Sequence, residues 1–150
     1  KQGFVVAAPE LSRAVRTSHQ FIIFCGQSAL QEGVALGIDS SEGYYERFLA
    51  DYTRKRDFLC DGLRQLGFRV FMPEGTYYAI VDIRSLGFED DVAFCRMIPE
   101  KAGVAAIPCS AFYFSDNPAR HLVRFAFCKK DETLQEALRR LKKWKTQLTG

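Results

Sequence analysis

The stretch "HLVRFAFCKKDETLQEALRRL", residues 121–141, decides the fold of this 150-residue chain. Its first part alternates apolar residues as a strand does, and its second part places apolar residues at helical spacing. Side chains point to opposite faces along a strand. The face expected to pack into the core consists of Val123, Phe125 and Phe127, and the other face of Leu122, Arg124, Ala126 and Cys128.

The guanidinium of Arg124 is the unusual group in this strand, because a desolvated cation is costly unless an anion pairs with it. The small residues on its own face leave room in front of it. Its planar fork suits a carboxylate or a phosphate held by two hydrogen bonds. Two alternatives remain open on spacing alone: an internal partner such as Asp82 or Glu74, or a bound ligand.

Periodicity and turn signals predict the remaining elements. Helices are expected from Pro9, over "QSALQEGVALGI" (27–38), over 41–66, over 89–101 and from Asp131, which is a plausible N-cap. Pro99 should kink or end its helix early. Strands are expected at 4–6, "FRVF" (68–71), "YYAIVDI" (77–83), "VAAIP" (104–108) and 121–127.

Two helices have a clear apolar face. The long helix over 41–66 carries apolar residues at intervals of three, four and seven, and Gly67 suits the position after its end. These residues are Tyr45, Phe48, Leu49, Tyr52, Leu59, Leu63 and Leu66. The last helix has a stripe of Leu134, Leu138, Leu141 and Trp144. We therefore predict an α/β fold, α+β-like, with a small mixed or antiparallel sheet covered by helices.

Composition is typical of a soluble globular domain, with 47% hydrophobic residues, 26% charged residues and a formal net charge of +3. The basic cluster at residues 139–145 is explained by a solvated helix face better than by nucleic acid. No apolar run approaches the ~20 residues that span a bilayer, so we expect a cytoplasmic protein without nucleic-acid or membrane partners. The cysteines show no metal-ligand spacing and are expected to be buried reduced thiols: Cys25, Cys60, Cys95, Cys109 and Cys128.

Weaker site candidates surround the turn before the third predicted strand. Gly75 and Thr76 could bring backbone close to a ligand or could simply form a hairpin turn. Tyr77 could donate a phenolic hydrogen bond to a ligand or merely pack. His19 is interpreted as a structural histidine rather than a catalytic one.

Several segments together resemble class I aminotransferases, the pyridoxal-phosphate enzymes of fold type I. They are "KQGFVVAAPELSRAVRTSHQF", "YTRKRDFLCDGLRQLGFRVFMPEGTYYAIVDI", "GVAAIPCSAFY" and "LVRFAFCKKDETLQEALRRLKKW". The branch that they resemble most contains kynurenine aminotransferases (glutamine transaminase K) and bacterial methionine aminotransferases. The resemblance implies that residues 1–40 end the large cofactor-binding domain and that residues 41–150 form the C-terminal small domain.

The resemblance also implies roles for single residues. Arg124 falls on the arginine that grips the substrate α-carboxylate, and Lys1 on the basic residue that contacts the cofactor phosphate. Phe24 and Cys25 fall where residues reach the neighbouring subunit's active site in a homodimer. The Schiff-base lysine would lie eight positions before Lys1, so this chain alone is expected to be inactive.

The activity implied is ping-pong transamination between an amino acid (methionine, glutamine, kynurenine or aromatic) and a 2-oxo acid. Two alternatives stay open: a cysteine-conjugate β-lyase of the same fold, and a non-catalytic ligand-binding or dimerisation module.

Overall fold

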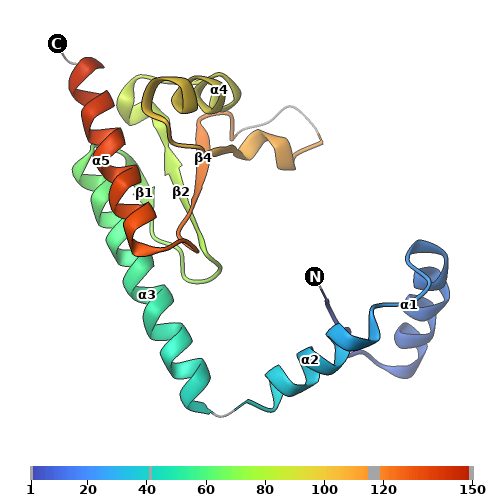
Figure 1. Ribbon diagram of the computed structural model, residues 1–150. Helices are drawn as coiled ribbons and strands as arrows, with labels where there is room; N and C mark the ends of the chain where they lie inside the picture. Colours follow the sequence, from blue (N-terminus) through green and yellow to red (C-terminus); the bar gives the residue numbers. More distant parts are fainter. Residues whose placement is uncertain (1, 41, 115–118, 149–150) are drawn as a thin grey trace. The chain divides into compact units, whose positions relative to one another are not determined.

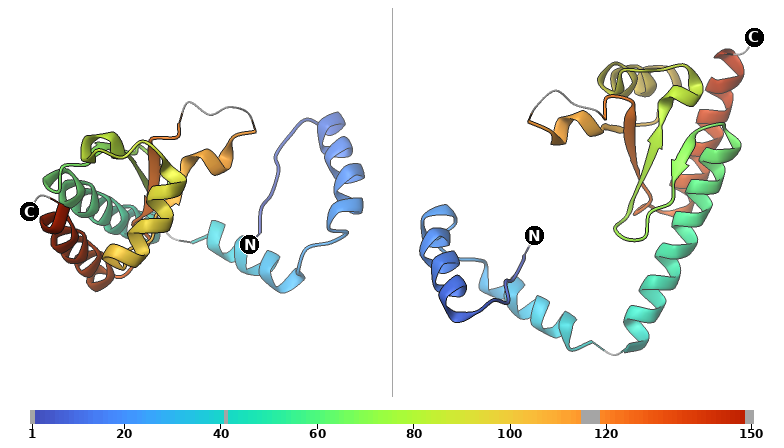
Figure 2. Two further views of the ribbon diagram at one scale, coloured as in Figure 1. Left: turned by 90° about the horizontal axis from the view of Figure 1, so that it is seen from above. Right: turned by 180° about the vertical axis from the view of Figure 1, so that it is seen from behind.

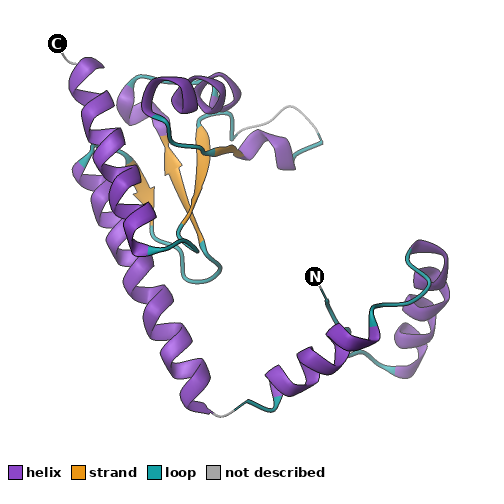
Figure 3. Cartoon of the chain, viewed as in Figure 1, coloured by secondary structure: helices purple, strands orange, loops and turns teal. Residues whose placement is uncertain are grey.

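The computed structural model describes residues 2–40, 42–114 and 119–148. Figures 1 and 3 show the helices and strands along the chain. The chain divides into two compact units, Lys1–Arg47 and Phe48–Gly150.

The first unit contains helices α1 (Pro9–Ile22) and α2 (Ser28–Ile38) and the start of α3 (Glu42–Gln65). Pro9 lies in the first turn of α1, as predicted, and Glu10 lies near the positive end of the helix. No residue of α1 or α2 is buried, so these helices build no core of their own within the described residues.

The prediction of a strand at residues 4–6 is wrong. Phe4, Val5 and Val6 are 71%, 66% and 89% exposed and have no regular secondary structure. A strand needs a neighbouring strand to bond its backbone groups, and the described residues pair none with this segment.

The second unit continues α3 and adds four strands, two short 3-10 helices and two long helices. Gly67, two residues after the last residue of α3, has a positive φ of 84°, which fits its predicted position after the end of the helix. The elements that follow are β1 (Arg69–Phe71), β2 (Tyr78–Asp82), η1 (Ile83–Leu86), α4 (Asp91–Ala102), β3 (Ile107–Pro108), η2 (Cys109–Phe112), β4 (Leu122–Ala126) and α5 (Asp131–Leu148).

The sheet is small and antiparallel, with the strand order β1-β2-β4-β3. Helices α3 and α5 run side by side along it, as both Figure 1 and Figure 2 show. Their contact is close at Gly62, where an added Cβ would lie 2.3 Å from Cδ1 of Leu138. The predicted fold class, a small antiparallel sheet covered by helices, is confirmed.

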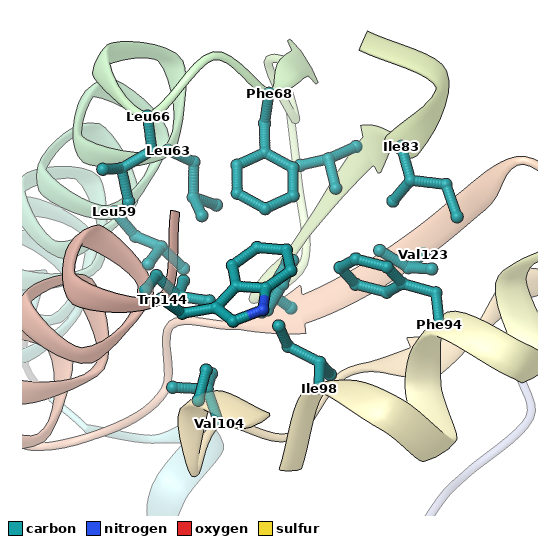
Figure 4. Packing of buried hydrophobic residues seen from close by; sticks show 14 of the residues in the cluster. Leu59, Leu63, Leu66, Phe68, Ile83, Phe94, Ile98, Val104, Val123 and Trp144 are labelled. Atoms are coloured by element: carbon teal, nitrogen blue, oxygen red, sulfur yellow. The ribbon is translucent and has the colours of Figure 1, made fainter. Parts of the chain in front are cut away.

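The core lies on one face of the sheet, where α3, α4 and α5 all pack (Figure 4). Val123 and Phe125 of β4 are 0% and 5% exposed there, and the predicted alternation along β4 is confirmed. Trp144 of α5 packs against Phe88 and Phe94, with ring centroids 6.1 Å apart in both pairs. The opposite face of the sheet carries Arg124.

Two helix boundaries differ from the prediction. Asp131 is the first residue of α5 rather than its N-cap, because the backbone N–H groups of Thr133 and Leu134 donate to the carbonyl of Lys130. The carboxylate of Asp131 instead accepts from Arg54 at 3.0 Å. Pro99 does not end α4 early, since the helix reaches Ala102.

Two further details were predicted incorrectly. The strand expected over 104–108 is only Ile107–Pro108. On α3, the residues of the first turns are exposed although their spacing predicted burial: Tyr45 (45%), Phe48 (48%) and Leu49 (67%). Spacing defines a face, but burial requires a partner for that face.

Candidate carboxylate-binding site

Arg124 lies in the middle of the sheet face that the core does not use. Its cross-strand neighbours are Ile80 on β2 and Ile107 on β3, which are 38% and 41% exposed. Because β4 is paired on both sides at this position, the backbone of Arg124 is fixed by two ladders. The site of the guanidinium is therefore determined by the sheet itself.

Two aromatic rings lie close to the guanidinium. Its central carbon lies 3.7 Å from the ring centroid of Tyr78 and 4.6 Å from that of Phe112. Tyr78 is two residues before Ile80 on β2 and so faces the same side, while Phe112 comes from η2. We name this arrangement of Arg124, Tyr78 and Phe112 the ring clamp. Cation–π attraction of this kind is worth about 0.5–2 kcal/mol per ring.

The guanidinium has an unsatisfied donor. Within the described residues, Nε of Arg124 is the only side-chain nitrogen or oxygen that is buried without a hydrogen-bond partner. No carboxylate of the described residues lies within 4 Å of it as an ion-pair partner. A buried donor without a hydrogen-bond partner costs about 1–3 kcal/mol, so its presence calls for an explanation, and a bound anion is one.

The internal salt bridges considered for Arg124 are not formed among the described residues. Asp82 is paired with Arg84, whose Nη2 lies 2.7 Å from Oδ2 and whose Nε lies 3.1 Å from Oδ1. Hydrogen bonds from Arg84 hold the pKa of Asp82 below its usual value of 3.8. Glu74, the other candidate, lines a hollow beside the turn before β2. The position of Arg124 therefore favours an external anion over an internal one.

Tyr77 lies next to the ring clamp but is not part of it. Its ring centroid is 4.3 Å from that of Tyr78, and the hydroxyl of Tyr78 donates to the hydroxyl of Tyr77 at 3.2 Å. This shared hydrogen bond raises the pKa of Tyr77, so the phenol stays neutral near pH 7. Tyr77, Gly75 and Thr76 line a hollow of about 270 Å³, and Thr76 has a positive φ of 63°.

The remaining predicted residues belong to the first unit. Lys1 lies outside the described residues. Phe24 is 82% exposed with a positive φ of 71°, an uncommon conformation for a bulky residue. Cys25 is exposed, and it lines a hollow of about 1000 Å³ together with His19.

The prediction that all five cysteines are buried is wrong for three of them. Cys60 and Cys109 are buried, Cys95 and Cys128 are half-buried, and Cys25 is exposed. Burial raises the pKa of Cys60 and Cys109, and it raises that of Cys95 to about 12. These thiols are consequently poor nucleophiles near neutral pH.

Sequence reasoning missed both rings of the clamp. Tyr78 lies on the face of Arg124 by parity, but only the β2–β4 register shows that it reaches the guanidinium. Phe112 lies in a short 3-10 helix without hydrophobic periodicity. The sequence predicted open space in front of Arg124, because its own strand has small residues on that face. The rings of Tyr78 and Phe112, which come from other elements, occupy that space.

Comparison with known proteins decides the family. Residues 1–141 match the family described as aminotransferase class I and II. The chain belongs to this family. It is 40% identical over 152 residues to a probable N-succinyldiaminopimelate aminotransferase of Mycobacterium tuberculosis, covering 94% of this chain and 38% of the relative. It is 34% identical over 142 residues to the methionine aminotransferase of Escherichia coli, covering 95% of this chain and 36% of that protein.

Solved aminotransferase structures share the fold. N-succinyldiaminopimelate aminotransferase from M. tuberculosis superposes with a TM-score of 0.83 at 42% identity, over 90% of this chain and 35% of the other. The E. coli methionine aminotransferase gives a TM-score of 0.79 at 33% identity, over 92% and 36%. This aminotransferase chain thus spans little more than a third of the length of the relatives that it matches.

Other site types have little support in the part of the aminotransferase chain that the structure describes. It contains no cluster of three or more residues able to hold a metal ion. None of its helices is long and apolar enough to cross a membrane.

In the basic cluster of α5, Arg139 and Arg140 both pair with Glu136, at 2.6 and 2.7 Å, and lower the pKa of that carboxyl to about 2.

Proposed function

We propose that this chain is the C-terminal part of a pyridoxal-phosphate-dependent aminotransferase and that Arg124 binds the α-carboxylate of its substrates. The observation that carries the proposal is the half-buried guanidinium with an orphan Nε and no internal anion within the described residues. Class I and II membership supports it, because this family transfers amino groups. Residues 1–40 would end the large domain, and residues 41–150 would form the small domain.

The role proposed for Arg124 is positioning. A carboxylate held bidentately by a fixed guanidinium has its α-carbon and amino group in a defined direction, which lowers the entropic part of the barrier. Bound pyridoxal phosphate supplies the electron sink that allows an amino group to move between an amino acid and a 2-oxo acid. Of the residues in this chain, the family resemblance assigns only Lys1 to the cofactor, so its use rests on family membership.

The contacts proposed for the first unit involve a second subunit. Phe24 and Cys25 would reach the active site of the neighbouring subunit in a homodimer. Both residues are exposed, Phe24 to 82%, so their side chains are available for such a contact.

The substrate proposal is an amino acid of the methionine, glutamine, kynurenine or aromatic type. The relatives add N-succinyldiaminopimelate to the compounds worth testing. Steady-state assays of the full-length protein with 2-oxoglutarate as acceptor and with each of these donors should rank them. Release of pyruvate and ammonia from cystathionine without net transamination would instead indicate a β-lyase.

The carboxylate role is tested with Arg124→Ala in the full-length protein. Loss of a bidentate charge-assisted pair should raise KM for amino acids about 10- to 1000-fold, while the absorbance of the bound cofactor stays the same. An amine that lacks the carboxylate should react equally well with both forms. Arg69→Ala is the matched control, because Arg69 is likewise a strand arginine beside an aromatic ring, that of Phe71 at 5.5 Å, but it lies on the edge strand β1. Equal KM values for Arg124→Ala and Arg69→Ala would refute the role.

A further inference from the structure

Asp91 is a fully buried carboxylate that has no part in the site described above. It is 0% exposed and begins helix α4. Its Oδ2 accepts from the backbone N–H of Ser110 at 2.7 Å, and its Oδ1 accepts from the hydroxyl of Ser110 at 3.0 Å. No cation pairs with it among the described residues. Burying a carboxylate is costly unless hydrogen bonds offset the cost, so the presence of Asp91 at this place calls for an explanation.

The residue that Asp91 holds belongs to the element that carries one ring of the clamp. Ser110 lies in η2, two residues before Phe112. This 3-10 helix has no side-chain cap, and Phe112 itself is 58% exposed, so burial does not fix the ring. The position of the ring consequently depends on the backbone of η2, and Asp91 anchors that backbone.

Asp91 also anchors the approach to β4. Its own backbone N–H donates to the carbonyl of Arg120 at 2.6 Å, four residues before Arg124. One residue therefore links the segment that carries Phe112 to the segment that carries Arg124. Both connections run through the same buried residue, so Asp91 ties η2 to the segment that leads into β4.

We propose that Asp91 and Ser110 are positioning residues of the carboxylate-binding site. Their hydrogen bonds hold η2 so that the ring of Phe112 stays against the guanidinium, to which the ring of Tyr78 also lies close. The two rings shield the guanidinium from water, and its N–H groups, including the Nε that has no partner among the described residues, remain the donors for a carboxylate in its plane. This inference rests on the proposed function of Arg124. It adds residues that act on the substrate only through the guanidinium.

The expected effect is a loss of carboxylate affinity, because a loosened arginine must be ordered again on binding. In the full-length protein, Phe112→Leu should raise KM for the amino acid substrate about 3- to 30-fold with a much smaller change in kcat. Ser110→Ala should also raise KM, by about 3- to 10-fold, since it removes one of the two hydrogen bonds between Ser110 and Asp91. Phe112→Tyr should restore the native KM.

Two controls separate positioning from general damage. Phe71→Leu also removes a ring that faces an arginine, Arg69, and should leave KM unchanged. A carboxylate-free amine should react equally well with the native protein and with Phe112→Leu and Ser110→Ala. In the Arg124→Ala background, Phe112→Leu should have no further effect, because interacting residues are not additive.

The outcomes distinguish this inference from the proposed function. A raised KM for Arg124→Ala with native values for Phe112→Leu and Ser110→Ala would overturn the positioning role and leave the function intact. If Ser110→Ala raises KM equally for the amino acid and for the carboxylate-free amine, the positioning role is overturned as well. If Arg124→Ala does not change the preference for amino acid over amine, the proposed function itself fails.

Discussion

Replacing Arg124 with methionine should leave the unliganded protein at least as stable as the native one. Methionine keeps the length of the side chain but removes the guanidinium and its orphan Nε. Removing an unsatisfied buried donor recovers about 1–3 kcal/mol. The substitution also removes the attraction of the guanidinium to the rings of Tyr78 and Phe112, which contributes about 0.5–2 kcal/mol of stability for each ring.

Contacts between the thioether and the same two rings offset part of that loss, at about 0.3–1.5 kcal/mol each. The opposing effects nearly cancel, and we expect the free energy of unfolding to change by less than about 1 kcal/mol. Binding of amino acids should be lost at the same time. Stability would then be separated from substrate binding at a single position, as is typical of functional residues.

Arg84→Met is the matched control. Arg84 is paired with Asp82, which is only 3% exposed, so its loss leaves a buried carboxylate without its cation. We expect a cost of about 1–3 kcal/mol, since Arg84 itself is half-exposed. Chemical denaturation of the full-length protein without substrate, followed by circular dichroism, compares the two variants. If Arg124→Met is as destabilising as Arg84→Met, Arg124 has an internal anion and the reasoning is wrong.

Three further predictions concern stability and reactivity. Hydrogen bonds from Arg84 lower the pKa of Asp82 in the folded state, so its contribution to stability is present above pH 3.8 and is lost as the pH falls through the folded pKa. Asp82→Asn should therefore cost about 1–2 kcal/mol at pH 7 and progressively less as the pH falls below 3.8 in urea titrations; a difference that stays constant from pH 7 to below pH 3.8 would contradict this. Gly62→Ala should lower the unfolding free energy by up to about 2 kcal/mol, because its Cβ would meet Leu138, and the same substitution should cost much less in a Leu138→Ala background, where the clashing methyl groups are gone. Cys95, with a pKa of about 12, should resist iodoacetamide at pH 8 in the native protein and react once guanidinium chloride unfolds the chain. Mass spectrometry that finds Cys95 alkylated in the native protein would refute the raised pKa.

The sequence was sufficient for the elements whose pattern is periodic. The alternation in β4 and the spacing in α3 and α5 predicted a small sheet covered by helices, and the alternation placed Arg124 on the face opposite Val123 and Phe125. These predictions depend on local geometry, which a strand or a helix imposes on any sequence. The same local rules failed at Phe48 and Leu49, because burial depends on what packs against a face.

The partners of Arg124 could not be predicted, because they depend on segments distant in sequence. Tyr78 reaches the guanidinium through the β2–β4 register, and Phe112 through a 3-10 helix that Asp91 holds in place. Neither segment has a pattern that signals contact with β4. Asp82 was a reasonable partner on charge alone, but Arg84 is two residues away in sequence and already bonds to it.

The geometry of β4 explains how a cation that has no internal anion among the described residues can be kept in place. Val123 and Phe125, on either side of Arg124, are buried in the core, and the strand is paired with β2 and β3. The hydrophobic core therefore fixes the backbone of the arginine, and the rings of Tyr78 and Phe112 restrict its side chain. Neither constraint neutralises the charge. A carboxylate that binds would meet a guanidinium already ordered, so little of its binding energy would be needed to order the side chain.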